Sequence, residues 1–171
     1  NANPQTEARK AIAAGEEIFN TFPLQIAGVG GLNDTLQQKT IVGTCTSCHD
    51  TPNVGNHSLP VPLDIGVSHS SAFETDADTN VALGQLDVPE LPIFKLTCRN
   101  VNPPRVAYTS DPGKALISGL CADLMRVKGP ILRGLAARAP YFHNGAASTL
   151  MQVVNFYNER GYIPSGLTLG K

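Results

Sequence analysis

The sequence predicts a mainly α-helical single domain of residues 1–171 with long loops, and three observations support that prediction. Segments near both ends of the chain carry apolar residues at helical spacing. A motif with two cysteines follows the first of these segments, at residues 45–49. The stretch from residue 50 to about residue 105 is rich in Pro, Asn, Ser and Thr and has little helical periodicity, which indicates long loops.

In the first half, we expect one long helix, with Thr6 as its N-cap and Pro23 beyond its end. Its apolar residues share one broad face, which consists of Ala8, Ala11, Ile12, Ile18, Phe19 and Phe22. The Gly-rich residues 28–33 are expected to form a turn without chemistry, because they lack the spacing of a phosphate loop. A short helix should carry residues 45–49, and a short hairpin is expected around residues 91–97.

In the second half, the expected helices cover residues 115–118, 131–137 and about 148–160. Thr149 and Gln152 fit a capping box at the start of the last helix. The apolar positions of this helix follow the spacing i, i+3, i+4, i+7 and are Leu150, Val153, Val154 and Tyr157. Gly161 would end it.

Residues Cys45-Thr46-Ser47-Cys48-His49 have the form C-x-x-C-H, which is typical of a c-type haem attachment site. The two thiols form thioethers with the vinyl groups of haem, and the adjacent His becomes the proximal ligand of the iron. A redox dithiol or half of a zinc site would also use C-x-x-C, but a full zinc site needs a second pair of ligands at short spacing. The motif predicts one covalent haem c, held by Cys45, Cys48 and His49, in a cytochrome c-like helical domain whose long loops wrap the haem.

The composition bounds the partners of this chain. The formal net charge is −1, so the overall charge predicts no nucleic-acid or membrane-surface partner, and no apolar run approaches the length of a membrane span. Redox proteins are the expected partners, and nothing in the sequence specifies an oligomeric state. Since a c-type haem is attached outside the cytoplasm, we expect a periplasmic or otherwise exported protein from which a signal has been removed.

Cys98 and Cys121 remain after the haem motif takes two of the four cysteines. An oxidising compartment favours their pairing as a disulfide. Closing this loop would contribute on the order of 3 kcal/mol, chiefly by restricting the unfolded chain. The alternative is a pair of buried free thiols; in either case the role is structural.

Four segments of the second half carry a resemblance to a known family: Lys128-Gly129-Pro130-Ile131-Leu132-Arg133-Gly134-Leu135, Ala139-Pro140-Tyr141-Phe142-His143-Asn144-Gly145, Thr149-Leu150 and Asn155-Phe156-Tyr157-Asn158. With residues 65–67 and 109–115, they make residues 43–161 similar to the C-terminal haem domain of the bacterial di-haem cytochrome c peroxidase and MauG superfamily. Those enzymes carry two haems on two domains, whereas this chain has one C-x-x-C-H motif.

The resemblance implies candidates for the distal side of the iron. The position of Tyr157 is Met in the peroxidases and Tyr in MauG-like enzymes, which makes Tyr157 the first choice as distal ligand. Tyr157 could instead simply pack on its helix face, and Met125 is the alternative ligand because a thioether often binds the iron of a cytochrome. Arg133, by its place in the Leu-Arg-Gly motif, is the candidate for a haem propionate. His143 would lie at the haem edge or fix its own turn.

Two functions follow from these features. A single haem without a second redox centre favours an electron-transfer cytochrome that carries one electron, and this reading makes the chain an electron carrier rather than an enzyme. The resemblance supports the alternative of a peroxidase- or MauG-like haem oxidoreductase, which would need a displaceable distal ligand and an acid–base group. A haem subunit or fragment of a larger oxidoreductase is the third possibility.

Overall fold

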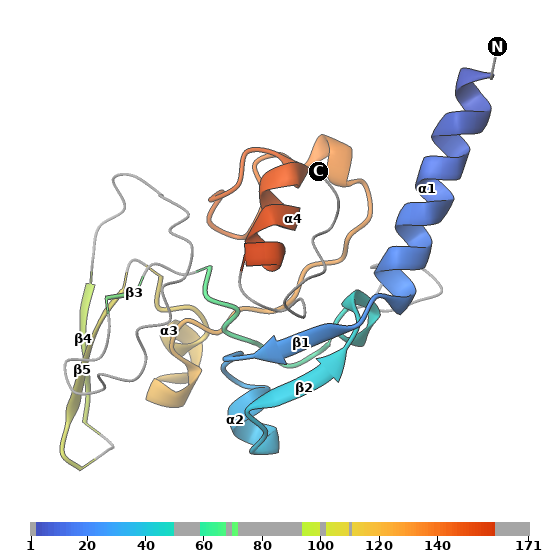
Figure 1. Cartoon of the computed structure of the whole chain (residues 1–171). Coiled ribbons are helices and arrows are strands. Elements are labelled where there is room, and N and C mark those ends of the chain that lie inside the picture. The colour runs from blue at the N-terminus through green and yellow to red at the C-terminus, as the bar shows by residue number, and fades with distance from the viewer. Residues whose placement is uncertain are drawn as a thin grey trace.

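The computed structural model describes residues 3–49, 59–67, 70–71, 94–99, 102–109 and 111–159 (Figure 1). Its helices are α1 (Pro4–Thr21), α2 (Asn33–Leu36), α3 (Ala115–Ser118) and α4 (Leu150–Glu159). Single turns of 3₁₀ helix are η1 (Cys45–Ser47), η3 (Cys121–Asp123) and η4 (Leu135–Ala137). Its strands are β1 (Leu24–Ala27), β2 (Thr40–Gly43), β3 (Ser70–Ser71), β4 (Phe94–Cys98) and β5 (Arg105–Thr109).

The described residues form a mixture of helices and small antiparallel sheets, whereas the sequence predicts a mainly α-helical domain. Two small antiparallel sheets, β1-β2 and β3-β5-β4, flank the short helix α3 and the turns around it (Figure 1). The helix expected at residues 131–137 shrinks to η4, because Gly134 adopts a left-handed conformation with φ 68° and interrupts it. None of the described helices is both long enough and apolar enough to cross a bilayer.

Helix α1 begins one residue after the start of the described chain and ends before Pro23, as the sequence predicts. Its N-cap is Asn3 rather than Thr6: the Asn3 side chain accepts a hydrogen bond from the Gln5 N–H at 3.0 Å, and Pro4 takes the first helical position. None of its residues is buried, and Ile12 is 71% exposed. Figure 1 shows α1 extending away from the rest of the chain, and the predicted apolar face is covered only near its C-terminal end, where Phe19 and Phe22 are half-buried.

The β1-β2 hairpin was not expected from the sequence. Its register pairs Leu24 with Gly43 and Ala27 with Thr40. The connection is held by the buried amide of Asn33, which donates to the carbonyls of Ile26 at 3.1 Å and Gln38 at 2.9 Å. The same side chain accepts from the Val29 N–H at 2.9 Å. One polar side chain therefore satisfies the backbone of the Gly-rich turn, where no chemistry was predicted.

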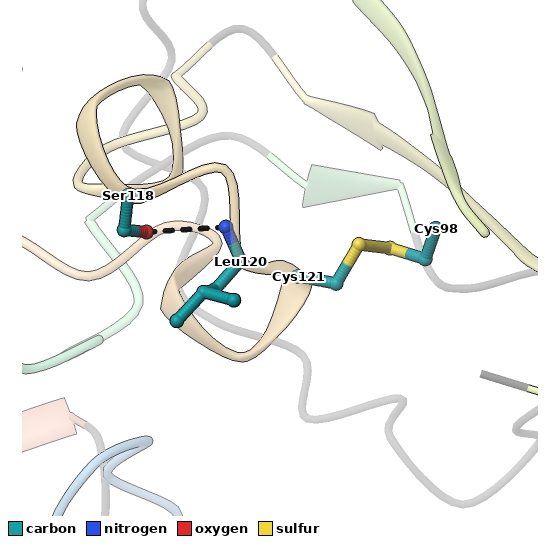
Figure 2. The surroundings of a disulfide bond; sticks show 4 residues. All are labelled: Cys98, Ser118, Leu120 and Cys121. Carbon is teal, nitrogen blue, oxygen red and sulfur yellow. Dashed lines mark hydrogen bonds between the residues drawn. A yellow bond between two sulfur atoms is a disulfide. The ribbon is translucent and has the colours of Figure 1, made fainter. Parts of the chain in front are cut away.

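The second sheet lies beside the disulfide. β4 pairs with β5 from Phe94 opposite Thr109 to Cys98 opposite Arg105, which places a strand at part of the predicted hairpin; residues 91–93 lie outside the described residues. Cys98 and Cys121 form a disulfide with a Cα–Cα distance of 5.7 Å, shown in Figure 2. A core cluster of Cys98, Ala107 and Leu124 surrounds it. The predicted pairing is therefore present and ties β4 to η3.

Residues 59–67 connect the two halves of the fold. Asp64 forms a bridge with Gly30 in the first half, and the neighbouring Leu63 forms a bridge with Val127 in the second half. Leu63 is also buried in a core cluster with Ile26 and Val29. The segment therefore acts as a short strap that brings the hairpin and the C-terminal part of the chain together.

Helix α4 has the capping box that the sequence predicts. The Gln152 N–H donates to the Thr149 hydroxyl at 3.2 Å, and the Gln152 side chain accepts from the Thr149 N–H at 3.1 Å. The buried residue of this helix is Phe156, at 4% exposure, which the predicted apolar stripe did not include. The expected end of the helix, at residues 160 and 161, lies outside the described residues.

Candidate haem site

The C-x-x-C-H motif sits on η1, directly after strand β2. The Thr44 backbone N–H donates to the Ser47 hydroxyl at 2.9 Å, and the Thr44 carbonyl accepts from the Ser47 N–H at 3.0 Å, so the turn is closed at its start. The Cys45 carbonyl then accepts from the backbone N–H groups of Cys48 and His49. In a 3₁₀ turn, side chains three residues apart eclipse each other. The two thiols are therefore presented on one side of the turn, as attachment to one porphyrin requires.

The environment of both thiols is apolar. Cys45 and Cys48 are half-buried and form no disulfide. Burial raises the pKa of each thiol above its ordinary value; in Cys45 a backbone hydrogen bond opposes part of that rise. The raised pKa keeps both residues protonated near neutral pH, whereas the reactive form of Cys is the thiolate. Such a pair suits conversion into uncharged thioethers, which carry no desolvation penalty in this setting.

The imidazole of His49 is held in a neutral form. Burial lowers its pKa below the ordinary value, and the backbone carbonyl of Pro130 acts on the ring in the opposite direction. Its Nδ1 atom is buried and has no hydrogen-bond partner among the described residues. Phe19 of α1 covers the ring, with a centroid separation of 6.5 Å. A neutral imidazole with one buried nitrogen is the form that ligates a metal while its other nitrogen faces a carbonyl.

Tyr157 is brought to the same place from the far end of the chain. A core cluster of Ile26, Val29 and Leu63 is contacted on its edges by both Cys48 and Tyr157. The Tyr157 ring also meets two other aromatic rings, Phe156 at 5.3 Å and Phe142 at 6.4 Å between centroids. The structure thus brings Tyr157 and the C-x-x-C-H motif to one apolar cluster.

Met125 lies elsewhere. It packs against the cluster of Cys98, Ala107 and Leu124, beside the disulfide. Its backbone is in a left-handed conformation with φ 60°, and its N–H donates to the Pro112 carbonyl at 3.1 Å. Met125, the alternative ligand, therefore packs against the cluster of Cys98, Ala107 and Leu124. Cys48 packs against the other cluster, that of Ile26, Val29 and Leu63.

The two remaining polar candidates lie at the periphery. Arg133 is exposed in the loop that precedes η4. His143 forms an ion-pair contact between its Nε2 atom and the Asp111 carboxylate. This contact links the His143 turn to the loop before α3.

Sequence reasoning did not identify Ile26, Val29, Leu63 or Phe142 as parts of the site. Ile26, Val29 and Leu63 come respectively from a strand, a turn and a strap, whose proximity depends on contacts between distant segments. Phe142 stands in a motif that the resemblance had singled out, but its left-handed backbone, φ 62°, has no local signal because aromatic residues do not favour that region.

Comparisons with known proteins place the C-terminal part of this site in a recognised class. Residues 128–162 match the family model described as RoxA-like, cytochrome c-like. The match includes Pro130, Phe142 and Tyr157. This part of the chain is therefore a cytochrome c-like domain segment, and a cytochrome c-like domain implies covalent haem c.

The curated relatives are cytochrome-c peroxidases. The chain is 48% identical to cytochrome-c peroxidase IdrP2 of Denitromonas iodatirespirans over 59 residues, which are 34% of this chain and 16% of that protein. It is 30% identical to IdrP2 of Pseudomonas sp. (strain SCT) over 128 residues, 72% of this chain and 30% of that protein. It is 27% identical to IdrP1 of the same strain over 124 residues, 68% of this chain and 28% of that protein.

The matches span less than a third of the length of each of these relatives. No solved structure matches the chain. The chain is thus related to part of the cytochrome-c peroxidases.

Proposed function

We propose that this chain is an exported c-type cytochrome that binds one haem covalently and carries one electron at a time. The observation that supports this most is the meeting of Cys48 and Tyr157 at the cluster of Ile26, Val29 and Leu63. That arrangement provides an apolar surround on which a porphyrin attached at Cys45 and Cys48 can pack. Haem, when bound, supplies the one-electron couple of its iron.

Different residues of the chain are proposed to hold the haem. Cys45 and Cys48 tether it, and His49 ligates the proximal side. Tyr157 is proposed as the distal ligand, because it reaches the cluster that Cys48 contacts and Met125 does not. Arg133 is proposed as a propionate partner, since its exposed guanidinium is available for a charge-assisted hydrogen bond.

A second candidate function is peroxide reduction, and the similarity to cytochrome-c peroxidases favours it. Such chemistry needs a side chain that delivers a proton on the distal side. The chain has one C-x-x-C-H motif, whereas the di-haem peroxidases that it resembles use two haems. For this reason electron transfer remains the first proposal, with other redox proteins as partners and residues 1–171 as a single domain.

Attachment is tested with the exported, mature protein. Its intact mass should include one haem, and Cys45→Ala/Cys48→Ala should abolish the covalent adduct. The matched control is Cys98→Ala/Cys121→Ala, which removes the same residue type from the disulfide and should retain the haem. A protein with no bound haem, or with an adduct unaffected by Cys45→Ala/Cys48→Ala, would refute the proposal.

Ligation and activity need separate readouts. Tyr157→Phe should change the ferric absorption spectrum, whereas Met125→Leu should leave it as in the wild type. Addition of peroxide together with a reduced electron donor should give no turnover above that of the buffer. Sustained peroxide-dependent oxidation of the donor would instead establish the peroxidase function.

A further inference from the structure

The turn at residues 141–145 precedes α4 and is closed by its own backbone. Tyr141 and Ala147 exchange backbone hydrogen bonds, with the Tyr141 N–H donating at 2.6 Å and the Ala147 N–H donating at 3.3 Å. Inside this closure the Gly145 N–H donates to the Phe142 carbonyl at 3.3 Å. The turn is thus a small closed unit at the base of the helix that carries Tyr157.

Side chains at both ends of this turn are tied to other segments. The Tyr141 hydroxyl donates to the Leu135 carbonyl of η4 at 2.9 Å. The Asn144 amide donates to the Val67 carbonyl, at the end of the strap, at 3.0 Å. These contacts join the turn to η4 and to the strap.

His143 adds a third connection. Its Nε2 atom contacts the Asp111 carboxylate, and a second oxygen of that carboxylate accepts from the Gly113 N–H at 3.0 Å. The Asp111 N–H in turn donates to the Thr109 hydroxyl at 3.0 Å. His143 is thereby attached to a loop whose own geometry is set by hydrogen bonds to backbone groups.

Phe142 lies between these connections in a left-handed conformation, with φ 62°. For a residue with a Cβ, this region is strained and persists only where the surroundings impose it. The ring of Phe142 meets Phe156 edge-on at 5.0 Å and Tyr157 at 6.4 Å, with an interplanar angle of 57° for the second pair. The unfavourable backbone therefore directs an aromatic ring against the side chain proposed as distal ligand.

We propose that Phe142 is a positioning residue for Tyr157 and that the backbone closure of its turn, together with the contacts of His143 and Asn144, maintains it. The proposal rests on Tyr157 being the distal ligand. Packing by Phe142 and Phe156 from two directions restricts the phenol ring of Tyr157 to one orientation. A single orientation gives the phenol oxygen one position relative to the iron of a bound haem.

The test compares Phe142→Leu with two other variants in the haem-loaded protein. Phe142→Leu keeps an apolar side chain but loses the ring, so the ferric electron paramagnetic resonance spectrum should resolve at least two species where the wild type has one. Phe142→Tyr retains the ring and should restore the single species. Tyr141→Phe is the matched control, because it removes a tether from the same turn without touching Tyr157, and it should keep one species.

Loss of stability in Phe142→Leu without any change in this spectrum would show that Phe142 only fills space, and would overturn the proposal. Phe142→Gly separates backbone from ring: it relieves the left-handed strain, yet should still produce the mixed spectrum. A wild-type spectrum in Phe142→Gly would likewise contradict a role for the ring.

A second readout separates this proposal from the ligand assignment. If Tyr157→Phe leaves the ferric spectrum unchanged, Tyr157 is not a ligand, and its ring is then followed by nuclear magnetic resonance. The reduced protein under carbon monoxide, with ¹³C-labelled tyrosines, should show one sharp Tyr157 ring signal. Splitting or broadening in Phe142→Leu but not in Tyr141→Phe would support positioning, and an unchanged signal in both variants would disprove it.

Discussion

The guanidinium of Arg126 lies 2.6 Å from the carboxylate of Asp34, and this contact joins the N-terminal hairpin to the disulfide-bonded half of the fold. Arg126 also approaches Asp123 at 3.9 Å, and Lys114 binds the other oxygen of Asp123 at 3.1 Å. One arginine is therefore shared between two carboxylates from segments that are far apart in the sequence. Its side chain is mostly buried, at 19% exposure, whereas that of Asp34 is 53% exposed.

Arg126→Leu should lower the free energy of unfolding by about 1–2 kcal/mol, because it leaves Asp34 unpaired and removes one of the two cations near Asp123. Because Asp34 is partly exposed, the loss of stability stays small. Added salt should reduce the difference in unfolding free energy between the variant and the wild type. Chemical denaturation at low and high ionic strength measures both effects.

The control is Lys10→Gln. It removes an ion pair whose two side chains are more than half exposed, and should lower the free energy of unfolding by less than about 0.5 kcal/mol. Equal losses in both variants would contradict a linking role for Arg126.

Asp123 should make the protein sensitive to acid. Its pKa lies below the ordinary value of 3.8, first because the Ser118 hydroxyl donates to it, then because Lys114 does, with Arg126 adding a smaller contribution. A carboxyl group whose pKa is lowered on folding adds stability above its unfolded pKa, and this stability is lost as the pH falls through the folded pKa. The stabilisation should therefore be complete near neutral pH and decline below about pH 4.

Urea unfolding between pH 2 and pH 7 tests this expectation. Asp123→Asn should show a flatter acid limb than the wild type, because the ionisation is removed. Ser118→Ala should move the acid transition to higher pH, since it deletes the largest cause of the shift while leaving the charges of Lys114 and Arg126 in place. An Asp123→Asn profile parallel to that of the wild type would show that another group controls the acid limb.

Much of what is local in this fold was predictable from the sequence. Pro4 and Pro23 bracket α1, and the Thr149–Gln152 pair marks the start of α4, because such signals act within a single turn of helix. The motif at Cys45–His49 likewise predicts its chemistry from five adjacent residues. The cap of α1 was wrong by three positions, since Asn3 with Pro4 behind it competes successfully with Thr6.

What the sequence did not reveal depends on distant pairing. Strands β1 and β2 have four residues each, too few for a clear alternation, and they become strands because each satisfies the backbone of the other. The packing of Cys48 and Tyr157 against one apolar cluster likewise depends on Leu63, which comes from a strap with no local pattern of its own. The resemblance to the di-haem peroxidase and MauG superfamily pointed to Tyr157 as a distal ligand. Its helical spacing alone predicts only that it lies on the apolar face of the last helix.

The disulfide between Cys98 and Cys121 should contribute about 3 kcal/mol to the free energy of unfolding, because it closes a loop with a sequence separation of 23 residues. Cys98 is 2% exposed, so replacement by Ala adds a small packing loss. Cys98→Ala/Cys121→Ala should therefore lose about 3–4 kcal/mol in denaturant titrations of the exported protein. A loss below about 1 kcal/mol would mean that the bridge restricts the unfolded chain far less than its loop length implies.

Two glycines allow a direct comparison of strain with steric conflict. Gly113 and Gly119 both have left-handed backbones, with φ 59° and φ 68°. A Cβ on Gly113 would lie 2.6 Å from the Arg126 carbonyl oxygen and 2.9 Å from the Arg126 nitrogen, whereas a Cβ on Gly119 would have no heavy atom within 4 Å. Gly119→Ala therefore tests the backbone conformation alone, and Gly113→Ala adds a collision with main chain that cannot move independently.

Gly119→Ala should destabilise the protein by about 1 kcal/mol, the cost of the conformation. Gly113→Ala should cost about 2–4 kcal/mol, since the Arg126 carbonyl also accepts the Lys114 N–H at 2.8 Å and must shift away from it. Denaturant titration of both variants gives the difference directly, and the second loss should exceed the first. If the two losses were equal, the close approach of Gly113 to Arg126 would have to be relieved by movement of the whole loop, and the Lys114–Arg126 hydrogen bond would add nothing measurable to the stability of this half of the fold.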